Sequence, residues 1–147
     1  MHRHNVFAAA MSLSGNLVVT GTVGGEVLVW STRPFAPVRE LGSPEHRGTI
    51  SALALSPDGK EALVAPDWKA AVERWNVESA TRGPALAAHS GRTTALAYAP
   101  GGALIASGGV DKLPSSGTAD EGDDEVPALA PPSVRLWRDG ALVHELT

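Results

Sequence analysis

Three residues in the C-terminal half are of types that could perform nucleophilic chemistry. His89, Ser107 and Asp111 supply the imidazole, hydroxyl and carboxylate of a Ser-His-Asp catalytic set. Such sets are defined by geometry and roles rather than by residue types. Ser107 lies in the apolar run LIASGG, which predicts a strand and lacks the G-x-S-x-G pattern of an exposed nucleophile. We therefore interpret the three as a buried polar set that satisfies its own hydrogen bonds, and predict no catalytic residue.

Other polar groups could bind a metal ion or a phosphate. His2 and His4 have no further clustered ligand, so we expect both to be solvated. The acidic run at 120–125 lacks the alternating ligand spacing of a calcium loop. The glycines at 21, 24–25 and 108–109 do not open a helix after a strand, as phosphate-binding loops do. We predict no metal site and no cofactor.

The composition is that of a soluble globular domain. Hydrophobic residues make up 43 % of the 147 residues and charged residues 19 %. The net charge is −4 with scattered Arg and Lys, which argues against nucleic-acid binding. No run approaches the roughly 18 apolar residues that span a bilayer. The apolar run at 6–11 is too short for a secretory signal and is read as a first strand. Cysteine is absent, and a cytoplasmic location, with the nucleus as an alternative, is the default expectation.

Three stretches of the chain repeat one another. They run from Val6 to Trp30, from Ile50 to Trp75, and from Thr93 to Lys112, resuming at 133–137. Their starts are 44 and 43 positions apart, and the first two tryptophans are 45 apart. The 62 positions from Trp75 to Trp137 return to this period once an insertion of about twenty residues is removed. A period of about 40 to 45 with a late tryptophan is typical of propeller blades.

Each repeat contains short apolar runs separated by turns. In the second, runs at 50–55, 62–65 and 72–75 predict three strands, with a weaker fourth at 84–88. Within the third run, Val72 is expected to face inward and Glu73 outward. The segment Ser56-Pro57-Asp58-Gly59 predicts a turn, and 14–16 and 100–102 take its place in the other repeats.

The repeats resemble WD40 repeats, in which a His, a Ser or Thr, an Asp and a Trp form one hydrogen-bonded set. The third repeat matches best, with His89, Ser107, Asp111 and Trp137. The second has His46, Asp67 and Trp75, with Ala65 near the hydroxyl position. The first has Thr20 and Trp30, with Gly24 near the Asp position and His2 as a loose match. The Trp-Asp dipeptide is absent, because Ser31, Asn76 and Arg138 follow the three tryptophans.

The resemblance implies an all-β fold of three four-stranded antiparallel blades, an incomplete ring of a WD40-type β-propeller. The expected blades are residues 1–45, 46–88 and 89–147. Residues 113–132, rich in Ser, Gly, Pro, Asp and Glu, are predicted to be a disordered acidic insertion between two strands of the third blade. The insertion is either tolerated without a role or a docking arm for a basic partner.

Three blades are fewer than the four to eight with which propellers generally close. The chain is therefore expected to be a piece of a longer protein, to pair with a second copy as a six-bladed ring, or to complete a propeller supplied by another chain. Each alternative gives a use to the apolar end faces, which would otherwise be exposed.

The resemblance further implies a non-catalytic scaffold that binds other proteins. We assign Trp30, Trp75, His89, Ser107 and Trp137 to structure. The candidate partner-binding residues lie near the predicted turns of one rim: His46, Arg47, Asp67, Trp68, Lys69, Arg92, Asp111 and Lys112. Trp68 is either a binding residue or a side chain folded onto its own blade. A ligand site in a central channel would need polar inner strands, whereas 52–54 and 95–97 contain only Ala and Leu.

Overall fold

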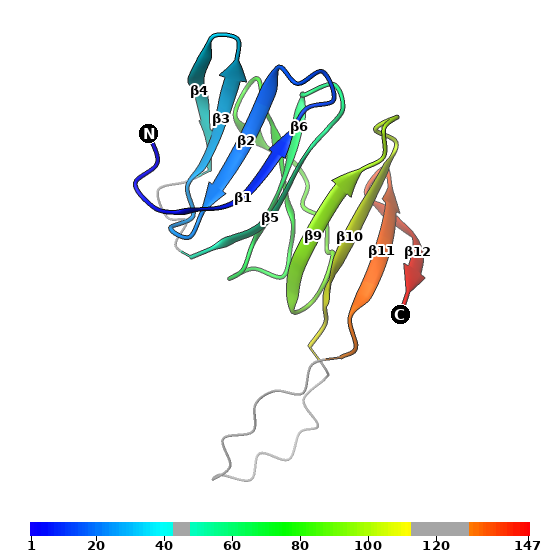
Figure 1. Ribbon diagram of the computed structural model, residues 1–147. Helices are drawn as coiled ribbons and strands as arrows, with labels where there is room; N and C mark the ends of the chain where they lie inside the picture. Colours follow the sequence, from blue (N-terminus) through cyan, green and yellow to red (C-terminus); the bar gives the residue numbers. More distant parts are fainter. Residues whose placement is uncertain (43–47, 113–129) are drawn as a thin grey trace, which may run out of the picture.

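The computed structural model describes residues 1–42, 48–112 and 130–147, and all regular elements in these ranges are β-strands. Three four-stranded antiparallel sheets follow one another along the chain, and they do not close into a ring (Figure 1). This arrangement confirms the all-β prediction of three four-stranded sheets. No helix in the described ranges is long and apolar enough to cross a membrane.

Each sheet uses four consecutive strands in chain order. The first contains β1 (Val6–Met11), β2 (Leu17–Thr22), β3 (Val27–Thr32) and β4 (Phe35–Leu41). The second contains β5 (Ile50–Leu55), β6 (Glu61–Pro66), β7 (Glu73–Asn76) and β8 (Thr81–Arg82). The third contains β9 (Arg92–Tyr98), β10 (Leu104–Val110), β11 (Ser133–Arg138) and β12 (Ala141–Leu146). The predicted insertion falls between β10 and β11, and its residues 113–129 lie outside the described residues.

The pairing registers show which positions are equivalent in the three sheets. At the start of the innermost strands, the equivalent pairs are Val6–Thr22, Ile50–Pro66 and Thr93–Gly109. In the third strands, they are Trp30–Val18, Trp75–Ala62 and Trp137–Ile105. The structural repeat therefore has the same spacing as the sequence repeat.

The turn after each innermost strand has the same backbone conformation. Gly15, Gly59 and Gly102 have φ values of 72°, 73° and 75°, a left-handed region that side chains disfavour. In the second turn, the Asp58 carboxylate accepts hydrogen bonds from the Ser56 hydroxyl at 2.7 Å and from the Lys60 N–H at 3.0 Å. Both the glycine and the aspartate thus have the local roles expected of turn residues.

The fourth strand of the second sheet differs from the prediction. It is the two-residue β8 rather than 84–88, where only Leu86 forms a bridge, to Val72. The chain reverses directly after β7, with Ala80 at a φ of 54°, so pairing begins earlier than the apolar residues suggest. Pro84 has no N–H to continue the ladder. Leu86 is nevertheless buried, which explains its apolar character.

The apolar side chains between the sheets form two clusters. The cluster between the first and second sheets includes Val19, Val29, Leu41, Leu53 and Trp75. The cluster between the second and third sheets includes Leu63, Val72, Leu86, Ile105 and Trp137. The innermost strands β1, β5 and β9 lie next to one another along the concave side (Figure 1). The middle sheet is consequently covered on both faces, and each outer sheet on one.

Candidate interaction surface

In the third sheet, the structure brings together the histidine, serine and tryptophan that the sequence singles out. The indole N–H of Trp137 donates to the Ser107 hydroxyl at 2.9 Å, and His89 Nε2 lies 3.2 Å from the same oxygen. His89 and Ser107 are each only 1 % exposed. A hydroxyl closed off from solvent and occupied by an indole donor stabilises the sheet but is not positioned to attack a substrate.

Asp111 joins this buried set to the rim of the sheet. Its carboxylate lies 3.7 Å from His89 Nδ1 and accepts hydrogen bonds from the N–H and hydroxyl of Ser90, at 2.6 and 3.0 Å. A guanidinium nitrogen of Arg135 lies 2.8 Å from Oδ2 of the same carboxylate. Burial alone would raise the pKa of Asp111, but the Ser90 hydrogen bonds and the Arg135 charge outweigh it and hold this pKa below its usual value.

The first sheet repeats this arrangement at the N-terminus with His2, which the sequence offers as a loose match to the set but predicts to be solvated. His2 Nε2 lies 2.6 Å from the Thr20 hydroxyl, which also accepts the indole N–H of Trp30 at 2.7 Å. The His2 side chain is only 10 % exposed, so the expectation of solvation was wrong for it. The Glu26 carboxylate lies 3.9 Å from His2 Nδ1 and takes the place that the Asp111 carboxylate has beside His89 in the third sheet. The sequence alone places Gly24 near this acidic position. Burial lowers the pKa of His2 and outweighs the attraction of Glu26.

The second sheet supplies its indole acceptor from the third strand itself. The indole N–H of Trp75 donates to Glu73 at 3.0 Å, and the other carboxylate oxygen of Glu73 pairs with Lys69 at 3.0 Å and Arg82 at 3.2 Å. Glu73 is therefore buried, against the prediction that it faces outward. By register, the position of Thr20 and Ser107 is held here by Val64 rather than Ala65.

The turn between β6 and β7 carries three of the predicted partner-binding residues. Asp67 is exposed, and its carboxylate accepts the N–H of Thr49 at 3.1 Å. Lys69 pairs with Glu73 but keeps 42 % of its side chain exposed. Trp68 is half-buried against the cluster between the first two sheets, and a Cβ at Gly48 would lie 2.7 Å from its ring. The Trp68 side chain therefore packs mainly against the apolar cluster between the first and second sheets.

Three more of the predicted residues, Arg92, Asp111 and Lys112, lie at the same rim, on the third sheet. Arg92 and Lys112 are exposed, and the Lys112 N–H donates to the Ser90 hydroxyl at 3.0 Å. An open cavity of about 570 Å³ lies between this region and the turn after β6, lined by Ala70, Ala71, Ala87, His89, Ser90, Asp111 and Arg135. The structure thus brings Asp111 close to the segment that follows Lys69. His46 and Arg47 lie outside the described residues.

Arg135 also belongs to this rim, although it is not among the site residues predicted from the sequence. It pairs with Asp111 and with Glu145, each at 2.8 Å, and donates to the carbonyl of Ala88. Burial opposes its charge, but the two carboxylates raise its pKa overall. Arg135 stands two residues before Trp137, as Glu73 stands two before Trp75. That shared spacing is the pattern from which both could have been found.

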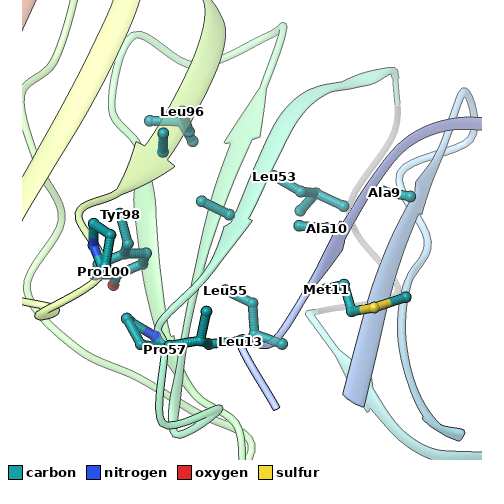
Figure 2. A pocket seen from close by; sticks show the side chains of 12 residues that line it. Ala9, Ala10, Met11, Leu13, Leu53, Leu55, Pro57, Leu96, Tyr98 and Pro100 are labelled. Atoms are coloured by element: carbon teal, nitrogen blue, oxygen red, sulfur yellow. The ribbon is translucent and has the colours of Figure 1, made fainter. Parts of the chain in front are cut away.

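The concave side of the three innermost strands is apolar. A cavity of about 340 Å³ there is lined mainly by Ala, Leu, Met and Pro side chains, which Figure 2 shows from close by. The Tyr98 hydroxyl at its edge donates to Glu61, and burial together with this carboxylate raises the Tyr98 pKa. In the described part of the chain, no group of three or more His, Asp or Glu residues is arranged to hold a metal ion.

Comparison with known proteins agrees with this geometry. The family model "WD domain, G-beta repeat" matches residues 82–113, which include His89, Ser107 and Asp111. A guanine nucleotide-binding protein subunit beta of Solanum tuberosum is 38 % identical over 73 residues, 48 % of this chain and 19 % of that protein. Human apoptotic protease-activating factor 1 is 32 % identical over 82 residues, 52 % of this chain and 6 % of that protein.

The similarity covers less than a fifth of the length of each of these relatives. It nevertheless falls on a chain with three equivalent four-stranded sheets, each with a tryptophan at the same place in its third strand. Two of these sheets also carry the His–hydroxyl–Trp set expected of the repeats. Residues 82–113 thus match a WD40 repeat, and the three sheets with their buried polar sets are consistent with three WD40-type propeller blades.

Proposed function

We propose that the chain is a non-catalytic scaffold that binds other proteins through the rim formed by the β6–β7 turn and the β10 end. The surface comprises Asp67, Trp68, Lys69, Arg92, Asp111 and Lys112, together with His46 and Arg47. The observation that carries the proposal is the open cavity of about 570 Å³ at this rim. The Asp111–Arg135–Glu145 ion pairs hold its wall in place, while Arg92 and Lys112 remain exposed to a partner.

Two further observations support a binding role without chemistry. His89 and Ser107, the residues that could form a nucleophilic pair, are almost completely buried. Several relatives are named as the beta subunit of a guanine nucleotide-binding protein, a name that describes one member of an assembly. The net charge of −4 favours protein partners over nucleic acid. We also propose a cytoplasmic location for the chain.

Charge reversal at the rim tests the scaffold role. Arg92→Glu and Lys112→Glu should abolish capture of at least one protein from a lysate of the source organism. Lys60→Glu, the same charge change in the β5–β6 turn at the opposite rim, should not. The captured protein, once purified, should bind the rim variants at least tenfold more weakly by calorimetry. If no protein distinguishes the rim variants from Lys60→Glu, the rim is not the binding surface.

A second candidate function is an assembly role, in which further blades cover the end faces of the chain. Val134 and Leu146 on the outer face of the third sheet are 43 % and 55 % exposed. Apolar side chains exposed in this way mark interfaces when they form a contiguous surface. The covering blades would come from a second copy, from another chain, or from more of the same protein.

A further inference from the structure

The contacts between the sheets follow one directional rule. The tryptophan side of the second sheet, with Trp75, packs against Val19 and Val29 of the first. The tryptophan side of the third sheet, with Trp137, packs against Leu63 of the second. In both contacts, the tryptophan face of one sheet therefore covers the opposite face of the preceding sheet.

The outer face of the third sheet has the same residues as the two faces that are covered. Three equivalent pairs join the third and fourth strands on this face: Val27–Leu41, Val72–Leu86 and Val134–Leu146. Their exposed fractions are 1 % and 1 %, 0 % and 2 %, and 43 % and 55 %. An open groove of about 480 Å³ runs beside Val134 and Leu146. This face is built like an inter-sheet contact whose other half is supplied from outside the three sheets.

Thr94 on this face repeats the polar part of such a contact. Its equivalent in the second sheet, Ser51, donates to the carbonyl of Ala65 in its own sheet and to that of Thr93 in the next. The hydroxyl of Thr94 donates to the carbonyl of Gly108, the counterpart of Ala65. The counterpart of Thr93 in the first sheet is Val6.

The outer face of the first sheet is the complementary half. It carries Trp30, which stacks on Phe35 with ring centroids 5.4 Å apart, and Phe35 is 73 % exposed. Figure 2 shows Ala9 and Met11 on the side of β1 away from Leu53, and Ala10 on the side toward it. Met11 is 60 % exposed, whereas its equivalent Leu55 is 6 % exposed. The chain therefore presents a tryptophan face at one end and its receiving face at the other.

One position at these contacts shows that the two open faces match each other. Between the first two sheets, Leu55 and Leu17 belong to one apolar cluster. At the equivalent place between the second and third sheets, the Tyr98 hydroxyl donates to Glu61. At the two open faces, the equivalent residues are Met11 and Leu104, which are both apolar. Neither would satisfy a polar partner such as Glu61 or Tyr98.

We propose that a second copy of this chain covers both open faces, the tryptophan face of each copy packing on the outer face of the other's third sheet. Two such contacts related by a twofold axis produce a closed ring of six sheets, within the range in which propellers close. The proposal rests on the assembly role and names its partner. It is independent of rim binding, so a failure of one leaves the other standing.

The first measurement is the mass of the purified chain by light scattering over a range of concentrations. A mass near 30 kDa, about twice the chain mass of 15.2 kDa, is expected at the higher concentrations. A monomer at all concentrations would overturn the proposal. Two variants then identify the faces: Met11→Lys and Leu104→Glu should each be monomeric because a charge is buried without a partner. Ala85→Lys, at an exposed position in the segment that follows β8, should leave the dimer intact.

Mixing the two monomeric variants separates the proposed pairing from other dimers. A mixture of Met11→Lys and Leu104→Glu contains one unaltered contact and one Lys–Glu contact, so it should recover the mass of a dimer. A dimer that survives in either single variant, or a mixture that stays monomeric, would contradict face-to-opposite-face pairing. Urea unfolding of each variant confirms that loss of the dimer is not loss of the fold.

The absence of cysteine allows an independent readout. A Met11→Cys, Leu104→Cys double variant treated with a short bis-maleimide should give a covalent dimer on a denaturing gel. The Ala85→Cys, Leu104→Cys variant is the matched control and should remain monomeric. Equal cross-linking of the two would show that the contact is not specific to these faces.

Discussion

At the scale of single residues, the three sheets place the same tryptophan in the same strand and satisfy it in different ways. An indole N–H can only donate, so when it is buried it requires an acceptor nearby. In the first and third sheets, the acceptor is the hydroxyl of a second-strand residue, Thr20 or Ser107. In the second sheet, the acceptor is the carboxylate of Glu73. The cationic groups of Lys69 and Arg82 make the burial of that carboxylate tolerable.

The Glu73 carboxylate is predicted to stabilise the second sheet. Glu73→Ala leaves the indole of Trp75 without this acceptor and should lower the free energy of unfolding by about 1–3 kcal/mol. The cost stays in that range because Lys69 and Arg82 are partly exposed and regain water. Urea denaturation at fixed protein concentration measures it. Glu78→Ala, at an exposed turn position, should change stability by less than about 0.5 kcal/mol, and an equal effect of both would refute the assignment.

Asp111 is predicted to make stability depend on pH in the acidic range. Its pKa is lowered in the folded protein, so its contribution is present above its unfolded pKa of about 3.9 and is lost as pH falls through the folded value. Asp111→Asn should therefore destabilise the protein most at neutral pH and least below about pH 4. The free energy of unfolding from pH 3 to 7 measures this. A constant difference across that range contradicts it, and Asp139→Asn, in the exposed β11–β12 turn, is the matched control.

At the scale of elements, strands and turns were predictable where local chemistry decides. The apolar run at 50–55 became β5, and the turn glycines adopt positive φ as expected. The position of β8 was not predictable, because a tight reversal after β7 determines where pairing starts. His2 was only a loose match in the sequence because its partner Thr20 is distant along the chain, and the hydrogen bond between them forms only in the folded sheet. Glu73 was missed because alternation alone places a carboxylate in solvent.

The turn after β5 is predicted to require glycine at one position. Gly59 has a φ of 73°, and an added Cβ would lie 3.1 Å from the Leu17 side chain. Gly59→Ala should therefore cost about 1–2 kcal/mol of stability. Gly101→Ala is the control, because no atom lies within 4 Å of its Cβ position and its φ is not positive; it should be neutral or slightly stabilising. Urea denaturation compares the two, and equal losses would contradict this interpretation of the turn.

At the scale of the whole molecule, the sheets differ in how much of each is covered. Every residue of β5 is buried, whereas every residue of β12 is exposed. The chain thus has a middle sheet with two neighbours and two outer sheets with one each, and its core does not extend to the end faces. Local stability generally follows burial, so the three sheets should not open with the same free energy.

Amide hydrogen exchange is predicted to report this gradient and its dependence on concentration. In dilute protein, the N–H groups of β5 and β6 should exchange most slowly, near the rate set by global unfolding, and those of β12 fastest among the strands. If a second copy covers the end faces, raising the concentration should slow exchange in β2 and β3 and in β10 and β11, while the pattern within β5 and β6 changes only through global stability. Leu104→Glu should remove the concentration dependence and keep the gradient. Exchange in β12 as slow as in β5 would contradict the gradient. If protection of the outer sheets is the same at all concentrations, the end faces stay uncovered.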